Sequence, residues 1–212
     1  PIFSANMDTT GTFETAITLQ KHKMLTAIHK FYSIKDWEKN VEKLDPNFIS
    51  VTVGQSKEDL QLGQKIFSLN SDIKYLCIDV ANGYREDFIN SVKNYRETFP
   101  DKIIIAGNVA TREMTEALIL AGADIVKIGI GPGSVCTTRS VAGVGYPQLS
   151  SISECSDAAH GLGGHVMADG GCKYPGDVSK AFGAGADYVM LGGMFAGHKE
   201  SGGELVLSLI HI

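Results

Sequence analysis

Short apolar runs rich in β-branched residues recur about eight times along this chain, and this recurrence constrains its fold more than any other feature of the sequence. Each run is almost continuously apolar rather than alternating, which is typical of strands buried on both faces of a parallel sheet. The runs span Pro1–Ala5, Met24–Ile28, Phe48–Val53, Tyr75–Val80, Lys102–Ala106, Asp124–Ile130, His165–Ala168 and Tyr188–Leu191. The sequence therefore predicts a parallel sheet of about eight strands.

Helical patterns of apolar residues fill the stretches between these runs. They span Thr12–His22, Ile34–Leu44, Glu58–Leu69, Glu86–Phe99, Arg112–Ala121, Leu149–Leu162 and Gly176–Gly185. Ser56 with Asp59 resembles a capping box at a helix start, and Gly122 and Gly185 lie where helices should end. Strict alternation of strand and helix gives either an open doubly wound sheet or a closed barrel. Eight strands favour the closed form, an α/β fold of the (β/α)8 or TIM-barrel type.

The composition agrees with one globular domain, because 212 residues with 43% hydrophobic and 20% charged residues are ordinary for such a protein. The net charge of −5 is mild and the basic residues are scattered, so no basic stripe suits a nucleic-acid polymer or an anionic membrane. No apolar run approaches the roughly 20 residues that span a bilayer, and the start PIFSANMDTT lacks the order of a signal peptide. We therefore expect a cytoplasmic protein without a nucleic-acid or membrane partner.

Four cysteines are spread along the chain without CxxC spacing, which argues against a zinc knuckle and against a disulfide framework. Cys77 falls inside a predicted strand and Cys155 inside a predicted helix, so both are interpreted as core residues. Cys172 follows a pair of glycines, where its backbone alone can serve a ligand. Cys136 differs from the other three because it lies on an irregular, glycine-rich loop.

The loop around Cys136 has the composition expected around a nucleophile. The hydroxyl of Thr138 and the charge of Arg139 can favour the thiolate of Cys136 over its thiol. Gly131 and Gly133 allow tight turns that direct carbonyl oxygens inward, where they could bind a monovalent cation as hard ligands. Spacing alone supports the cation only weakly, whereas the neighbouring hydroxyls and Arg139 give Cys136 the setting of a nucleophile.

Polar and glycine residues follow the predicted strands at their carboxyl ends, where a parallel barrel builds its active site. The pairs Gly170-Gly171 and Gly192-Gly193 follow the last two strands, at the place where barrels bind a phosphate on backbone N–H groups. Asp169 can accept hydrogen bonds from ribose hydroxyls, although a capping aspartate would look the same. Turn chemistry explains a single glycine pair equally well. Two pairs on adjacent strands favour a phosphate site.

Several strings of the sequence are specific enough to resemble one enzyme family. They are NMDT at 6–9, DVANG at 79–83, AGNV at 106–109, GIGPGSVCTTR at 129–139, GVGYPQL at 143–149, DGGC at 169–172 and FGAGADYVMLGGMFAGHKESGGE at 182–204. From Pro1 to about Leu205 the chain resembles the family of IMP dehydrogenase and GMP reductase. Within that family, DVANG, the CTTR ending and AGHKESGGE are similar to the GMP reductases.

The resemblance implies an oxidoreductase that converts GMP to IMP and ammonia with NADPH, through a covalent thioimidate on Cys136. Thr138 matches the residue that helps to move protons at the leaving amine. The positions that match GMP contacts are Asp169, Gly170, Gly171, Gly192 and Gly193. Those that match NADPH contacts are Lys30, Asp79, Val80, Ala81, Ile130 and Gly131, and those that match a potassium ion site are Gly131, Gly133, Cys136 and Arg139. The resemblance also implies a homotetramer for the complete protein.

The C-terminal part of the chain departs from the family pattern. In the family the chain continues beyond Glu204 with a mobile flap that carries a glutamate, a base- and phosphate-binding loop and the final barrel helix, and LVLSLIHI matches none of these. We therefore expect residues 1–205 to form an incomplete catalytic barrel without its last helix and flap, and residues 206–212 to form a non-family tail. By itself the chain is expected to turn over GMP poorly.

Three other functions stay open on the sequence. The first is an IMP dehydrogenase, which forms the same thioimidate by oxidation of IMP. The second is an inactive subunit that only binds nucleotide or joins an oligomer. The third is an unrelated phosphate-binding barrel such as a sugar-phosphate aldolase, which needs a Schiff-base lysine at a strand end. Lys127 lies within a predicted strand, but the cysteine loop argues against an aldolase.

Overall fold

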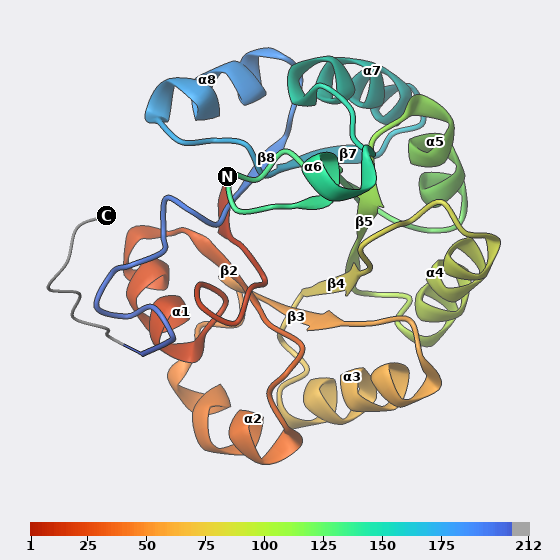
Figure 1. Ribbon diagram of the computed structural model, residues 1–212. Coiled ribbons are helices and arrows are strands. Elements are labelled where there is room, and N and C mark those ends of the chain that lie inside the picture. The colour runs from red at the N-terminus through yellow and green to blue at the C-terminus, as the bar shows by residue number, and fades with distance from the viewer. Residues whose placement is uncertain (205–212) are drawn as a thin grey trace, which may run out of the picture.

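Eight parallel strands close into a barrel in the computed structural model, which describes residues 1–204 of the chain (Figure 1). Strands that are consecutive in sequence are neighbours in the barrel, and the last strand pairs with the first. They are β1 (Ile2–Ser4), β2 (Leu25–Ile28), β3 (Ile49–Val53), β4 (Tyr75–Asp79), β5 (Ile103–Val109), β6 (Ile125–Ile128), β7 (His165–Asp169) and β8 (Tyr188–Leu191). The predicted eight-stranded parallel α/β barrel is confirmed.

Helices follow the strands and, apart from one short helix in the loop after β6, surround the barrel as an outer ring (Figure 1). They are α1 (Phe13–Leu19) with the 3-10 turn η1 (Gln20–His22), α2 (Ile34–Asn40) with η2 (Val41–Lys43), α3 (Lys57–Leu69), α4 (Glu86–Thr98), α5 (Arg112–Leu120), α6 (Thr138–Ala142), α7 (Gln148–Gly161) and α8 (Pro175–Gly183). Ser56 and Asp59 form the predicted capping box, with reciprocal backbone-to-side-chain hydrogen bonds of 3.0 and 3.1 Å. None of the helices in residues 1–204 is long and apolar enough to cross a membrane.

Three segments differ from the sequence prediction, each for a local reason. β5 runs on to Val109, because its end still pairs with the next strand through Gly129 N, which donates to Val109 O at 2.8 Å. β6 stops at Ile128, because Gly129 leaves the strand conformation with φ +150°. α6 was not predicted, since its five residues carry no helical repeat of apolar side chains before Gly143 ends it at φ +65°.

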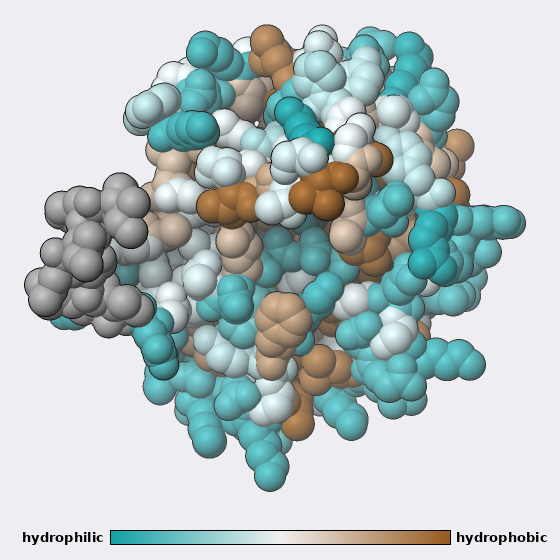
Figure 2. All heavy atoms as spheres, viewed as in Figure 1, coloured by the Kyte–Doolittle hydropathy of each residue, from teal (hydrophilic) through white to brown (hydrophobic). Residues whose placement is uncertain are grey.

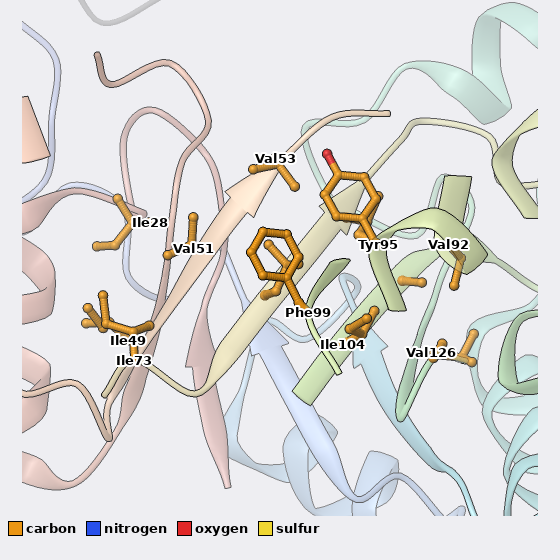
Figure 3. Close-up of a cluster of buried hydrophobic side chains, with 14 of the residues drawn as sticks. Ile28, Ile49, Val51, Val53, Ile73, Val92, Tyr95, Phe99, Ile104 and Val126 are labelled. Carbon is orange, nitrogen blue, oxygen red and sulfur yellow. The ribbon is translucent and has the colours of Figure 1, made fainter. Parts of the chain in front are cut away.

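Two apolar layers hold the barrel together, one inside it and one between the strands and the helices. Inside, Phe3 makes edge-to-face contacts with Tyr75 and Tyr188 at centroid distances of 5.8 Å. Outside, Figure 3 shows aliphatic side chains of the strands, among them Val53, beside the ring of Tyr95 from α4. The inner layer is therefore mostly apolar, with the buried hydroxyl residues Ser50 and Thr52 on β3, and its charged side chains lie toward the carboxyl ends of the strands.

Tyr95 is buried, and its hydroxyl donates a hydrogen bond of 3.0 Å to the backbone carbonyl of Gly54. Tyr95→Phe is expected to lower the free energy of unfolding by about 1–2 kcal/mol, because the buried carbonyl loses its partner. Urea unfolding measures this loss, with Tyr174→Phe at an exposed position as the control. Equal stability of the two variants would show that the hydrogen bond contributes nothing.

The segment after β8 folds back over α1 (Figure 1). The hydroxyls of Thr12 and Thr15 donate to the carbonyl of Glu200 at 3.2 and 3.1 Å, and Gly202 N donates to Thr9 O at 2.8 Å. Within residues 192–204 this segment contains no helix. The tail predicted at 206–212 lies outside the described residues.

Candidate active site

A row of charged side chains crosses the carboxyl end of the barrel interior. Lys127 of β6 is 2% exposed, and its Nζ lies 2.8 Å from Asp79 Oδ1 at the end of β4 and 3.0 Å from Asp169 Oδ2 at the end of β7. Lys30, two residues after β2, approaches Asp79 Oδ2 at 3.5 Å. One buried lysine thus joins two carboxylates that are 90 residues apart in sequence, by subtraction of 79 from 169.

The charges in this row stabilise one another. Burial disfavours ionised Asp79, but the charge of Lys127 and hydrogen bonds from Lys127 and Asn6 outweigh it and lower the pKa of Asp79 to about 2. Burial also opposes the charge on Lys127, yet Asp169 and Asp79 together raise its pKa. Lys127 therefore stays an ammonium ion, whereas a Schiff base requires a neutral amine. The aldolase alternative loses its candidate lysine.

Two residues near the end of β5, Gly107 and Asn108, lie beside this charged row. A Cβ atom at Gly107 would lie 2.5 Å from the Lys127 carbonyl oxygen, so only glycine fits beside the lysine. The next residue, Asn108, donates from Nδ2 to Asp169 Oδ2 at 2.8 Å and to Gly129 O at 2.9 Å. The side-chain amide of Asn108 therefore holds both the Asp169 carboxylate and the first residue of the cysteine loop.

The cysteine loop, residues 129–147, connects β6 to α7 and carries α6 across the near side of the barrel (Figure 1). The Arg139 side chain organises it by donating to Ile130 O at 3.3 Å and to the carbonyl of Tyr146. Cβ atoms at Gly131 and Gly145 would lie 2.7 and 2.6 Å from Arg139 side-chain atoms, so both glycines allow the close approach. The loop is thus folded around an arginine that is not free to contact a ligand.

Apolar side chains lie exposed on this loop. Val135 and Val141 are 79% and 81% exposed. Figure 2 shows brown side chains near the middle of the same face, within a mostly hydrophilic surface. Exposed valines beside a candidate site are suited to contact with another segment or ligand rather than with water.

Cys136 has the setting of a reactive thiol. It is exposed, and its Sγ lies 3.3 Å from the Thr138 hydroxyl. Hydrogen bonds from the side chain and the backbone of Thr138, with the charge of Arg139, lower the pKa of the Cys136 thiol. Burial raises the pKa of the other three thiols, in the case of Cys77 to about 12. The prediction that Cys77 and Cys155 are core residues is confirmed by their burial.

Iodoacetamide near neutral pH is expected to label Cys136 at least about tenfold faster than partly buried Cys172, because alkylation requires an accessible thiolate. Cys77 and Cys155 are expected to react only after unfolding. Thr138→Val should slow labelling of Cys136 and move the pH midpoint of its reaction upward, since the variant removes the hydroxyl that lowers the thiol pKa. Peptide mass spectrometry measures the rates, and equal labelling of Cys136 and Cys172 would contradict this account.

The two glycine pairs converge on the cysteine loop. Cβ atoms at Gly170 and Gly171 would lie 3.1 and 3.3 Å from Pro132, and both residues have positive φ angles, +88° and +90°. A Cβ at Gly193 would lie 3.8 Å from the Ser134 hydroxyl. The structure therefore brings together the ends of β6, β7 and β8, as expected from the sequence. The neighbouring Gly192 faces Met7 after β1, with its Cβ position 3.1 Å from the Met7 sulfur.

Two buried acceptors beside this convergence lack a hydrogen-bond partner among the described residues, Asn108 Oδ1 and Gln148 Oε1. Gln148 donates from Nε2 to Ile128 O at 2.9 Å and to Asp169 O at 3.4 Å, so it links the ends of β6 and β7. Unpaired buried acceptors are rare in proteins, and they fit a site that meets a ligand, an ion or water.

The positions predicted to contact the cofactor lie on two sides of the charged row. Lys30, Asp79, Val80 and Ala81 come from the ends of β2 and β4, and the Lys30 ammonium also donates to Asp79 O at 3.2 Å. Ile130 and Gly131 begin the cysteine loop after β6. Asp79 is the last residue of β4 and the other positions follow strand ends, so all of them lie at the same end of the barrel as Cys136.

The positions predicted for potassium lie on the cysteine loop, and their backbone oxygens are the ligands to consider. Gly133 O already accepts a hydrogen bond of 3.1 Å from Cys136 N. Gly131 turns at φ +73°. The guanidinium of Arg139 is a cation and donates to two carbonyls, so this residue can offer a cation only its backbone oxygen. The donor set fits a hard monovalent cation.

Sequence analysis gave no role to three residues that the structure places in the site: Asn108, Gln148 and, as an ion-pair partner, Lys127. Lys127 carried a signal, since a lysine within an apolar strand needs a buried counter-charge. Asn108 and Gln148 fall in motifs of the sequence, AGNV and GVGYPQL, but their partners are set by the closed barrel.

Comparison with known proteins gives matches along almost the whole chain. A family model described as the IMP dehydrogenase / GMP reductase domain matches residues 1–209. A protein named GMP reductase from Vibrio vulnificus (strain YJ016) is 57% identical over 210 residues, covering 98% of this chain and 60% of the relative. Another, from Buchnera aphidicola subsp. Schizaphis graminum, is 58% identical over 209 residues, covering 97% and 60%. The chain thus spans about 60% of the length of these curated relatives.

Among solved structures, an inosine 5' monophosphate dehydrogenase from Legionella pneumophila is similar to this chain with a TM-score of 0.88. The two sequences are 37% identical, and the match covers 96% of this chain and 61% of the other. The barrel and its loops therefore follow the fold of that enzyme.

Proposed function

The chain belongs to the IMP dehydrogenase / GMP reductase family, and we propose that it is the barrel portion of a GMP reductase that converts GMP to IMP and ammonia. The observation that carries the proposal is the 57–58% identity to proteins named GMP reductase over 97–98% of the chain. The exposed Cys136 with its lowered pKa supports it, because the reaction needs a thiolate at the substrate.

Cys136 is the proposed nucleophile. Its thiolate attacks carbon 2 of the purine, a bond forms between sulfur and that carbon, and the exocyclic amine takes up protons and leaves as ammonia. The product of this step is a thioimidate on Cys136. Thr138, 3.3 Å from the sulfur, is placed to pass a proton at the leaving amine, a role for which it needs an acidic partner.

GMP is proposed to lie across the ends of β6, β7 and β8. The backbones of Gly170, Gly171, Gly192 and Gly193 can approach a phosphate without a Cβ in the way, and Ser134 lies near the second pair. Asp169 is held by Lys127 and Asn108 with one oxygen, which leaves the carboxylate able to accept a ribose hydroxyl. This arrangement would keep carbon 2 near the cysteine loop while the phosphate stays at the glycines.

NADPH supplies a hydride to carbon 2 when it is bound. The residues proposed to hold it lie on two sides of the charged row: Lys30, Asp79, Val80 and Ala81 at the ends of β2 and β4, and Ile130 and Gly131 after β6. Cleavage of the carbon–sulfur bond after reduction returns the thiolate of Cys136 and releases IMP. Asn108 Oδ1, which has no hydrogen-bond partner among the described residues, could accept a hydrogen bond from a ligand bound at this end of the barrel.

A potassium ion is proposed to bind the backbone oxygens of Gly131, Gly133, Cys136 and Arg139. Such an ion would fix the turn that presents the Cys136 sulfur. The Arg139 side chain shares this task by binding Ile130 O and Tyr146 O. The complete enzyme is further proposed to act in the cytoplasm as a homotetramer, which light scattering of the whole protein tests.

The experiment that tests the proposed function compares two reactions of one protein. The chain, continued by the C-terminal part of the Vibrio vulnificus relative, is mixed with GMP and NADPH or with IMP and NAD, and absorbance of the reduced cofactor is followed. Loss of NADPH that depends on GMP supports the reductase. Formation of NADH that depends on IMP instead supports an IMP dehydrogenase, the alternative favoured by the Legionella structure. GMP binding without either reaction would support an inactive nucleotide-binding subunit.

A further inference from the structure

The sequence Ala-Gly-Ala-Asp occurs twice, at 121–124 and at 184–187, and the structure places both copies at the amino end of the barrel. Each copy ends one residue before a strand, β6 in the first case and β8 in the second. The glycines Gly122 and Gly185 have almost the same φ angle, +109° and +110°. The two aspartates, Asp124 and Asp187, can therefore be compared as equivalent positions in one barrel.

Both aspartates cap the preceding strand in the same way. Asp124 Oδ2 accepts from Ile104 N of β5 at 2.7 Å, and Asp187 Oδ2 accepts from Val166 N of β7 at 2.8 Å. In return Ile104 O accepts from Asp124 N and Val166 O accepts from Asp187 N, both at 2.9 Å. This cap explains why an aspartate occupies each position. It uses Oδ2 as acceptor, so each carboxylate can still interact with a further group.

The two copies differ in the partner of the carboxylate. Arg96, in the last turn of α4, forms an ion pair with Asp124 and also donates to Gly122 O at 2.9 Å. The corresponding place in the last turn of α7 is taken by His160, whose Nε2 lies 2.9 Å from Asp187 Oδ2. Within residues 1–204, no lysine or arginine forms an ion pair with Asp187. The second copy thus lacks the fixed cation of the first.

A second imidazole completes the group. His165, the first residue of β7, places Nδ1 at 3.4 Å from Asp187 Oδ1. One ligand atom from each of His160, His165 and Asp187 lies within 4.8 Å of the others. Both histidine side chains are about half exposed, at 47% and 52%, so an ion from solvent can reach them.

We propose that His160, His165 and Asp187 bind a zinc ion at the amino end of the barrel. Two imidazole nitrogens and one carboxylate are a common three-residue ligand set for zinc, with water in the fourth position. Zinc bond lengths of about 2.0–2.2 Å put tetrahedral ligands about 3.3 Å apart. His160 Nε2 lies 2.9 Å from Oδ2 of Asp187 and His165 Nδ1 lies 3.4 Å from Oδ1, so each imidazole approaches a different oxygen of the carboxylate. With one ligand atom from each residue within 4.8 Å of the others, small side-chain rotations bring the three atoms to this spacing. The ion would give Asp187 a positive partner, as Arg96 does for Asp124 in the first copy.

The proposed zinc site is separate from the candidate active site. His165 begins β7, whereas Asp169 of the active site ends it, so the length of the strand lies between them. Bound zinc would connect the end of α7, the start of β7 and the residue before β8. Its effect is therefore on the stability of the β7–β8 unit rather than on the reacting atoms.

Zinc binding is tested on the 212-residue chain carrying Cys136→Ala, because the exposed thiol would otherwise compete as a ligand. Calorimetric titration with zinc chloride measures stoichiometry and affinity in this background and in two further variants, His160→Gln and His165→Gln. His22→Gln, at an exposed histidine on η1, is the matched control. The absorption spectrum with cobalt(II) in place of zinc reports tetrahedral coordination without any change to the site, and circular dichroism establishes that each variant is folded.

The proposal expects about one zinc ion per chain, at least about tenfold weaker binding in His160→Gln and in His165→Gln, and unchanged binding in His22→Gln. It also expects zinc to raise the thermal midpoint of the background protein but not of the two site variants. Absence of saturable binding, or binding that survives both substitutions, would overturn it. A third outcome, in which the site variants lower the thermal midpoint equally with and without zinc, would identify a hydrogen-bonded cap only and would also overturn it.

Discussion

Cys136→Ala is expected to lower GMP-dependent NADPH oxidation by at least about 10⁴-fold in the chain continued by the C-terminal part of a GMP reductase relative. The reason is that alanine cannot form the carbon–sulfur bond on which both half-reactions depend. Binding should persist, since the proposed phosphate and ribose contacts come from the glycine pairs and from Asp169. The measurement is NADPH absorbance at saturating GMP, with GMP affinity determined separately by calorimetry.

Two variants make the Cys136 prediction specific. Cys172→Ala is the matched control, because this partly buried thiol lies at the same end of the barrel but has a raised pKa, and it should keep nearly full activity. Thr138→Val should lower kcat by about 10²–10⁴-fold, the usual range for a lost proton-transfer group. If Cys136→Ala retained activity comparable with Cys172→Ala, the nucleophile would have to be another residue.

Lys127→Met is expected to lower the free energy of unfolding by about 3–5 kcal/mol, the usual cost of removing one partner from a buried ion pair. Methionine can fill most of the space of the lysine side chain, so the loss is mainly electrostatic. Asp79 and Asp169 would then face each other without the ammonium ion that lies 2.8 and 3.0 Å from them. Urea unfolding followed by circular dichroism measures the change.

A charge-balanced variant separates the electrostatic effect from lost packing. Lys127→Met combined with Asp79→Asn restores the net charge of the row, because Lys30 and Asp169 remain as one positive and one negative group. The double variant should regain part of the stability lost in Lys127→Met. Lys93→Met, at an exposed position on α4, should change stability little. A double variant no more stable than Lys127→Met alone would assign the loss to packing.

Much of the barrel could be predicted because its strands and helices carry local signals. The run Tyr75–Val80 is apolar on both faces, and its strand begins at the same residue in the structure. The capping box at Ser56 marks the start of α3 within one residue. β6 was predicted two residues too long at its carboxyl end, since Gly129 and Ile130 continue the apolar pattern and only the backbone angle of Gly129 ends the strand.

The candidate site could be predicted only in part, for a physical reason. Composition identified the cysteine loop and the glycine pairs, because glycine and proline act locally on the backbone. The partners of Lys127 could not be predicted. They depend on how the strands are arranged in the closed barrel and on which inward-pointing side chains lie at the same level along the barrel axis. The same holds for Asn108, whose contacts with Asp169 and Gly129 arise from closure of the barrel.

Peptide mass spectrometry after incubation with GMP tests the central claim most directly, on the chain continued by the C-terminal part of the Vibrio vulnificus relative. The account predicts an adduct on the peptide that contains Cys136, with the mass of GMP less ammonia, and predicts no adduct on that peptide after Cys136→Ala. Absence of the adduct, together with absence of GMP-dependent NADPH oxidation, in a folded protein that binds GMP would contradict the proposed chemistry.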